Sequence, residues 1–217
     1  MRRKGVKFNT KGLVRKLIVA MAGLVICGIG VGIFLYSGLG VDPASVFELG
    51  IGNVFHISYG TSAAAINVVI LAVVFFLDKS YINIASILAI FGIGYTADFA
   101  NFILRIIFKG EQHIVVRLVM IIIGLLIMSA GIAAYIRADL GVGAIDLVSE
   151  IISDKLKISY RGVRVSADVT FVVVGFLLGG SVGIGTVLAA FMTGPSVQFL
   201  RPYVHKAADL VLKREET

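Results

Sequence analysis

Tryptophan is absent from this 217-residue chain, and cysteine occurs only once, as Cys27. A lone cysteine excludes a disulfide or a cysteine-based metal site within one chain. The three histidines, His56, His113 and His205, stand far apart and at no metal-ligand spacing, so we expect no metal. No GxxxxGK(S/T) phosphate loop occurs, so the chain is not expected to hydrolyse nucleotide by itself. We therefore expect no cofactor, and active transport would need an ion gradient or a separate energising partner.

Charged residues are scarce. They make up 15% of the chain, whereas hydrophobic residues make up 58% and the mean hydropathy is +0.98, values that no ordinary soluble domain approaches. A helix crosses a bilayer with about 20 mostly apolar residues. Six stretches of this kind occur, at residues 17–37, 61–77, 82–101, 118–136, 162–178 and 182–200. The first is not expected to be a cleaved signal peptide, because its counterpart recurs inside the chain.

The sequence repeats itself at a fixed offset of 101 residues, with no gap. The strings LGV at residues 39–41 and ISY at residues 57–59 return at residues 140–142 and 158–160. The same offset pairs Gly23 with Gly124, Gly30 with Gly131, Asn67 with Asp168, and Phe75 with Phe176. This pattern indicates a tandem duplication with three spans in each half.

The equivalent loops of the two halves differ in positive charge, which places them on opposite sides of the membrane. The N-terminal segment is rich in Lys and Arg, the loop at residues 37–60 has neither, and its repeat at residues 138–161 has several. An odd number of spans per half forces inversion, and cytoplasmic loops attract Lys and Arg. With both termini cytoplasmic, all Lys and Arg except Arg105, Lys109 and Arg117 are inside. The net charge of +7 is then explained by orientation and anionic lipid headgroups, not by nucleic acid.

These patterns predict an all-α transmembrane fold in a bacterial inner membrane. We expect a six-helix bundle made of two inverted three-helix repeats, each with an extra short helix after its first span. The expected parts are a basic N-terminus, a first repeat, a linker, a second repeat and a cytoplasmic tail, at residues 1–16, 17–108, 109–116, 117–202 and 203–217. Homo-oligomerisation is left open.

The segment after the first span of each half breaks the helix with glycines. Gly40 precedes Asp42, which can cap a new helix that begins at Pro43. Gly141 precedes the equivalent start near residue 143, where Asp146 follows. Each short helix is either interfacial and parallel to the membrane, or re-entrant with its N-terminus aimed at a substrate. Asp42 and Asp146 are candidate binding residues, and Gly40 and Gly141 are candidate hinges.

Polar residues inside spans are costly in lipid and usually face the bundle or a cavity. Asn67 and Asp168 occupy equivalent positions about 10 Å into their helices, which makes Asp168, supported by Asn67, the first candidate for substrate or ion binding. The alternative is a local ion pair of Asp168 with Arg164, one turn earlier. If Asp168 faces a cavity, burial favours its protonated form, as a proton-coupled carrier needs.

Three further features carry weaker expectations. Asp98 is interpreted as part of a helix emerging at the outer surface, with an external gate as the alternative. Gly194 and Pro195 interrupt the last span and are candidate hinge residues. Tyr59 is one of several tyrosines near span ends that are interpreted as interfacial anchors.

The strings LGVDPASVF, LGVGAIDLVS and GGSVGIGTVLAAFMTGP resemble the YitT/YczE group of small bacterial multi-pass membrane proteins, and the resemblance covers residues 17–202. It implies a membrane protein with a suspected transport role and supplies no binding residue.

A small secondary transporter that moves a solute by alternating access explains the duplication, the broken segments and the polar pair together. A substrate-capturing subunit of a multi-component transporter and a non-transporting accessory or scaffold protein remain alternatives. An intramembrane aspartyl protease does not fit, because GVGAID lacks the GxGD spacing. The substrate, the coupling ion and the direction of transport are undetermined.

Overall fold

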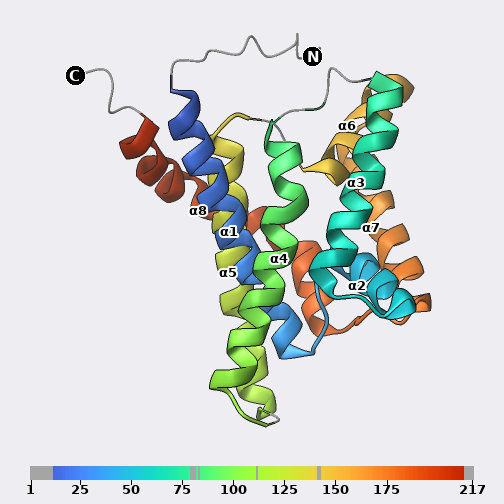
Figure 1. Ribbon diagram of the computed structural model, residues 1–217, viewed down its shortest axis with the longest axis vertical. Coiled ribbons are helices and arrows are strands. Elements are labelled where there is room, and N and C mark those ends of the chain that lie inside the picture. Colours follow the sequence, from blue (N-terminus) through green and yellow to red (C-terminus); the bar gives the residue numbers. More distant parts are fainter. Residues whose placement is uncertain (1–11, 79–81, 83, 111, 141–142, 213–217) are drawn as a thin grey trace.

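The computed structural model describes residues 12–78, 82, 84–110, 112–140 and 143–212. Across these residues the secondary structure is helical, with no strand (Figure 1). The eight helices are α1 (Leu13–Ser37), α2 (Pro43–Phe55), α3 (Tyr59–Asp78), α4 (Ile84–Ile107), α5 (Ile114–Arg137), α6 (Ala144–Leu156), α7 (Tyr160–Leu177) and α8 (Ile184–Leu212).

The short helix expected after the first long helix of each half is present. The bounds of α2 and α6 differ by the 101-residue offset, as do the starts of α1 and α5 and of α3 and α7. Left-handed backbone recurs at the same offset, in Gly38 and Asp139 (φ 61° and 53°) and in His56 and Lys157 (φ 54° and 55°). The duplication in sequence is therefore also a repeat of local backbone conformation.

The centre of the molecule is the contact between α1 and α5, where glycines bring the two backbones together. A Cβ on Gly131 would lie 2.3 Å from the Cys27 nitrogen, and one on Gly30 would lie 2.4 Å from the Met128 nitrogen. Gly23 faces Gly131, and Gly30 faces Gly124. These glycines serve close helix packing, because no larger residue fits at these positions.

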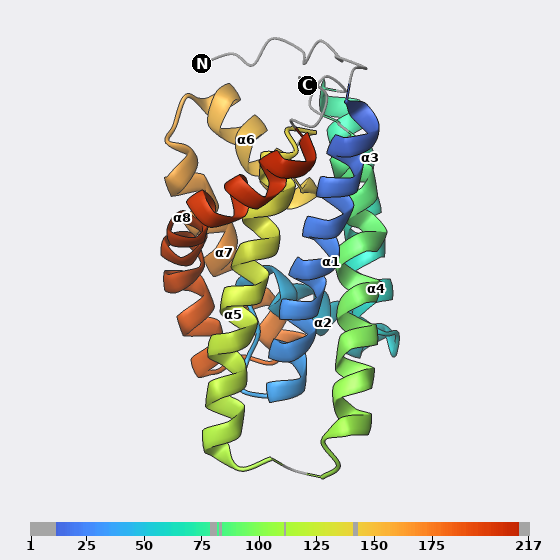
Figure 2. The ribbon, with the colours of Figure 1, turned by 90° about the vertical axis from the view of Figure 1, so that its left-hand side faces the viewer.

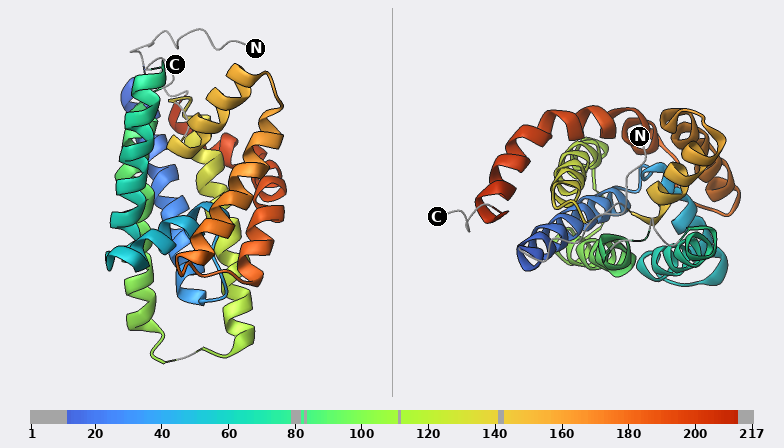
Figure 3. Two further views of the ribbon diagram at one scale, coloured as in Figure 1. Left: turned by 90° about the vertical axis from the view of Figure 1, so that its right-hand side faces the viewer. Right: turned by 90° about the horizontal axis from the view of Figure 1, so that it is seen from above.

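The other long helices flank this pair. The helix α4 packs against α1, and α8 packs against α5 (Figure 2). The remaining helices α2, α3, α6 and α7 form a second group beside α4, in which α2 contacts α7 and α6 contacts α3 (Figure 3). The start of α1 and the end of α8 pack together at one end of the molecule, and the turn between α4 and α5 lies at the other.

Four of the described helices are long and apolar enough to cross a membrane, at Leu13–Ser37, Tyr59–Phe76, Ser86–Ile107 and Ile114–Arg137. The sequence predicted six spans. The two that fall short are α7, which is 18 residues long and contains three charged residues, and α8, which is less apolar on average than the four candidate spans. Large apolar side chains face outward even on these helices, for example Leu177 and Phe191 (77% and 75% exposed), as expected of a lipid-facing surface.

The last helix departs from the expected domain bounds. It continues through Pro195 and Pro202 to Leu212, so part of the predicted tail at residues 203–217 is helical. It curves around α5 (Figure 3). Gly194 is not a packing residue, because a Cβ added there would meet nothing within 4 Å. Gly194 and Pro195 remain candidate hinges in a continuous helix.

Candidate functional site

A buried carboxylate on a short helix is the most unusual polar group in the described structure. Glu48 lies on α2 and is 6% exposed, and Tyr59, the first residue of α3, is equally buried. The Tyr59 hydroxyl lies 2.8 Å from Oε2 of Glu48. A buried carboxylate is costly unless its oxygens are hydrogen-bonded or it is protonated.

Two further side chains extend this contact into a chain. The Ser45 hydroxyl lies 2.9 Å from the Tyr59 hydroxyl and donates to Oδ1 of Asp42. Asp42 also caps α2, since its Oδ2 accepts from the Ser45 N–H. The chain Asp42–Ser45–Tyr59–Glu48 therefore joins two carboxyl groups through two hydroxyls. We call these four side chains the carboxyl chain.

The number of protons in the carboxyl chain decides its charge. Three oxygen–oxygen contacts connect the four side chains, and each hydrogen bond needs one proton. The hydroxyls of Ser45 and Tyr59 supply one proton each. The third bond is complete only when one carboxyl group is protonated. The geometry therefore favours a chain that holds one carboxyl proton.

Glu48 is the carboxyl group that electrostatics selects for this proton. The helix α2 has 13 residues, too few to span a bilayer. Burial raises the pKa of Glu48 from 4.5 to about 8, the negative charge of Asp42 raises it further, and the hydrogen bond from Tyr59 opposes both. Burial is the largest of these effects, so Glu48 holds its proton more firmly than an ordinary carboxyl group does.

The carboxyl chain lies level with the middle of a long helix. Gly60, next to Tyr59, packs against Gly94, which lies near the midpoint of α4. Ser62, one turn into α3, donates to the backbone oxygen of Glu48 and joins α2 to α3. Because α3 is a candidate span that begins at Tyr59, the carboxyl chain lies at one end of α3 and beside the middle of α4.

Asp98 has a structural role that the sequence did not predict. Its Oδ2 accepts from the Gly60 N–H at 2.9 Å, so it caps the start of α3 from the neighbouring helix α4. The sequence interpretation placed Asp98 on a helix emerging at the outer surface, whereas the structure places it half-buried, one turn beyond Gly94. It therefore lies beside the carboxyl chain.

The residues first selected from the sequence fall elsewhere. Oδ1 of Asp168 lies 3.2 Å from Nε of Arg164, so the local ion pair is present. Asn67 donates to the Ala63 oxygen of its own helix. Asn67 and Asp168 thus each make a local contact within their own helix. Gly141 lies outside the described residues, and Asp146 is described only as backbone of α6.

The carboxyl chain occurs in one half only. At the 101-residue offset, Glu48 corresponds to Ser149 and Asp42 to Gly143. Sequence analysis missed Glu48 and was wrong about Tyr59, which is buried rather than an interfacial anchor. The available signal was the spacing of Asp42, Ser45 and Glu48, three residues apart and hence on one helix face. Across the described residues, no group of three His, Cys, Asp or Glu side chains is arranged to hold a metal.

Replacing Tyr59 by Phe tests the carboxyl chain directly. The change removes the hydroxyl that contacts both Ser45 and Glu48, and we expect a loss of ~1–3 kcal/mol in stability. Thermal melting of the purified protein checks this loss. Tyr203→Phe is the control, since Tyr203 is 67% exposed, and equal effects in the two variants would contradict the interpretation.

Comparisons with known proteins place the chain in a family. Residues 14–202 match the model of "Family of unknown function (DUF6198)". The chain is 27% identical over 191 residues to "Uncharacterized membrane protein YczE" of Bacillus subtilis, covering 88% of this chain and 87% of the relative. It is 32% identical over 185 residues to an "Uncharacterized protein" of Haemophilus influenzae, covering 85% and 83%. No solved structure matches. The resemblance inferred from the glycine-rich motifs is confirmed, and the chain belongs to the DUF6198 family of YczE-like bacterial membrane proteins.

Proposed function

We propose that this protein is a small proton-coupled secondary transporter, and not an enzyme, that moves a solute by alternating access between two inverted repeats. The observation that carries the proposal is the carboxyl chain, which needs one carboxyl proton to complete its hydrogen bonds. A protonatable group that is buried in the protein and joined to the N-termini of two helices has the properties that a coupling site requires.

The helix contacts support inverted repeats. If the halves exchange under a two-fold operation, α1·α4 becomes α5·α8 and α2·α7 becomes α6·α3, and all four contacts occur, whereas the α3·α4 contact has no counterpart of similar extent between the described residues of α7 and α8. The same operation turns the contact of Gly23 with Gly131 into the contact of Gly124 with Gly30, which also occurs. Reciprocal contacts of this kind are the signature of a two-fold relation.

The proposed topology has six spans, with α7 and α8 as the fifth and sixth, and both termini in the cytoplasm. Arg161 and Arg164 lie in the first two turns of α7, where long side chains reach a membrane surface, so they are compatible with a span. The inner membrane is the proposed location, with anionic headgroups as partners of the cytoplasmic basic residues.

Loss of the Glu48 proton gives a physical reason for α2 to move away from α3. When Glu48 loses its proton, the carboxyl chain loses one hydrogen bond, and two negative charges, Asp42 and Glu48, share one buried region. Like charges in a low-dielectric site repel. The protonated state therefore holds α2 against α3, whereas the deprotonated state favours their separation. Proton binding thus biases a two-state equilibrium.

Proteoliposomes loaded with a pH-sensitive dye test the proposal. In a panel of metabolites and drugs, we expect at least one solute gradient to drive proton movement without nucleotide. Glu48→Gln should reduce that movement to the level of empty liposomes, and Glu150→Gln on the equivalent helix α6 should not. Solute movement that requires an added ATPase and nucleotide would instead identify a substrate-capturing subunit. Solute movement without proton movement, unchanged in Glu48→Gln, would refute proton coupling.

A further inference from the structure

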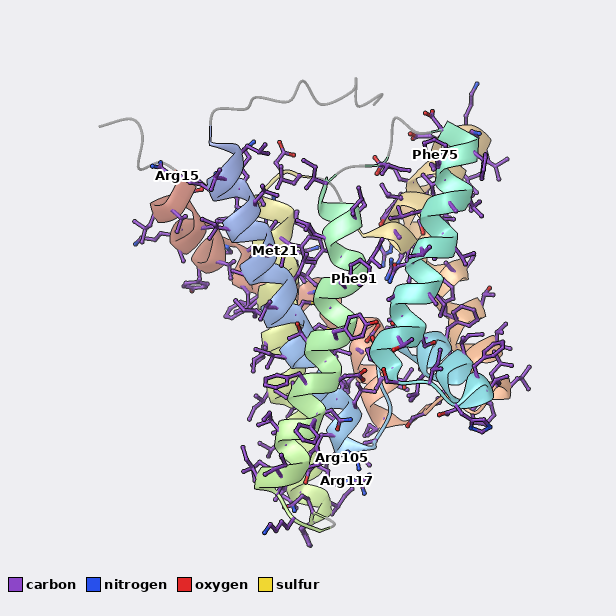
Figure 4. All side chains as sticks on the ribbon, in the orientation of Figure 1. Arg15, Met21, Phe75, Phe91, Arg105 and Arg117 are labelled. Carbon is purple, nitrogen blue, oxygen red and sulfur yellow. The ribbon has the colours of Figure 1, made fainter. Side chains whose placement is uncertain are left out.

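A cavity of about 200 Å³ lies at the end of the molecule opposite the start of α1 and the end of α8. It opens between the end of α1, the last turn of α4 and the start of α5. Its lining includes Tyr36 and Gln112 together with Arg105 and Arg117, and the two arginines are labelled in Figure 4. About 10–15 Å³ suffices for one water. The cavity therefore has room for several waters or for a phosphate group.

Each of the two arginine side chains is held in place by a hydrogen bond that its Nε atom donates. Nε of Arg117 donates to the Ser37 oxygen at the end of α1, and Nη2 of Arg117 lies beside Gly38, where an added Cβ would approach it to 2.9 Å. Nε of Arg105 donates to Oδ1 of Asn101. Neither guanidinium is paired with a carboxylate of the described residues. The terminal N–H groups are thus directed by the fold and available to an acceptor.

The surroundings combine positive charge with an apolar surface. Arg117 lies in the first turn of α5, where the helix dipole favours an anion. Phe102, Ile106 and Ile107 are exposed on the adjoining face of α4. Tyr36 closes one side through its hydroxyl, which donates to the Phe108 oxygen. Arginines in a polar cavity next to apolar surface match a phosphate group that carries acyl chains, as well as a free phosphate.

The charge distribution adds an independent argument. Arg105, Lys109 and Arg117 are the positive residues that depart from the cytoplasmic bias of the rest of the chain. Orientation in the membrane does not explain them. Two of the three line one cavity, and a ligand of opposite charge would explain that convergence.

We propose that this cavity binds a phosphate-class anion through Arg105 and Arg117. Guanidinium groups form paired, charge-assisted hydrogen bonds with phosphate oxygens, which is why arginine is favoured at phosphate sites. The anion is either the headgroup phosphate of an anionic phospholipid or free inorganic phosphate. The inference stands apart from the proposed transport function, since it uses no residue of the carboxyl chain.

Binding to the full-length purified protein tests the site. Native mass spectrometry and thermal melting are performed with phosphatidylglycerol and, separately, with inorganic phosphate. We expect saturable binding of one of them, weakened at least about tenfold in Arg105→Gln/Arg117→Gln. A response to phosphatidylglycerol alone identifies a lipid site, and a response to inorganic phosphate identifies a free-anion site. Arg105→Gln alone serves if the double variant fails to fold, because the hydrogen bond that Arg105 makes among the described residues stays within its own helix.

Lys109→Gln is the matched control, because Lys109 carries the same charge near the cavity without lining it. Equal weakening in Lys109→Gln would indicate non-specific attraction and overturn the proposal, as would absence of binding by either compound. Glu111 lies outside the described residues but adjoins the lining residues Gly110 and Gln112 in sequence. Binding seen only in Glu111→Gln would show that the chain's own carboxylate fills the site, which also contradicts the proposal.

Discussion

Replacing Glu48 by Gln should remove most of the pH dependence of this protein's stability. Burial raises the pKa of Glu48 from 4.5 to about 8 in the folded protein, whereas the unfolded chain keeps the ordinary value. Between these two pKa values the folded state binds more protons than the unfolded state. Stability is therefore greatest at low pH, falls as the pH rises through this window, and levels off above about 8.

The size of this effect makes it measurable. Each pH unit within the window changes the free energy of unfolding by up to about 1.4 kcal/mol, so the full window amounts to several kcal/mol. We expect the melting temperature of the wild-type protein in detergent to fall between about pH 5 and about pH 8. Glu48→Gln keeps the shape and part of the hydrogen bonding of the side chain but cannot ionise. Its melting temperature should stay nearly level.

Glu150→Gln provides the comparison. Glu150 lies on α6 and is only half-buried, so its replacement should leave the pH dependence as in the wild type. If wild type, Glu48→Gln and Glu150→Gln all show the same slope, another group titrates and the carboxyl chain is not the proton site. A wild-type protein that is most stable at high pH would contradict the predicted direction of the pH dependence.

The parts of the fold that follow from local rules were predictable from sequence. The start of α2 follows from a capping aspartate before a proline, and its repeat begins at the same offset without either residue. Such features depend on residues near in sequence or on an internal duplication, and both can be read from one chain. The glycines at equivalent positions were evidence of duplication in the sequence, and only the structure shows that they bring α1 and α5 together.

The carboxyl chain was not predictable in the same way. Whether Glu48 faces lipid, water or protein depends on how α2 folds back onto α3, and this is set by contacts such as Ser62 with the Glu48 backbone and Gly60 with Gly94. Equivalence of Asn67 and Asp168 suggested a shared site, but repeat symmetry relates positions without bringing them together. Asp168 instead forms an ion pair with Arg164, four residues earlier in the same helix.

Replacing Gly131 by Ala should destabilise the protein strongly, because the change pushes apart the two helices at its centre. A Cβ at this position would lie 2.3 Å from the Cys27 nitrogen and 2.6 Å from the Gly23 oxygen, both backbone atoms of α1. Backbone cannot rotate away as a flexible side chain does, so α1 and α5 must separate. Overpacking of this kind costs about 1–3 kcal/mol or more. That exceeds the gain of about 1 kcal/mol that alanine brings to a helix.

Gly194→Ala separates packing from helix propensity. Gly194 also lies within a helix, but its added Cβ would meet nothing within 4 Å, so this variant should melt at or slightly above the wild-type temperature. Gly131→Ala should melt several degrees lower, with less folded protein recovered from membranes. Equal melting temperatures for the two variants would mean that α1 and α5 are not in backbone contact. Gly30→Ala extends the test, because its Cβ would lie 2.4 Å from the Met128 nitrogen in the reciprocal contact. Since a two-fold relation between the halves makes the two contacts equivalent, Gly30→Ala and Gly131→Ala should lose similar stability, and a large loss in only one of them would count against that relation.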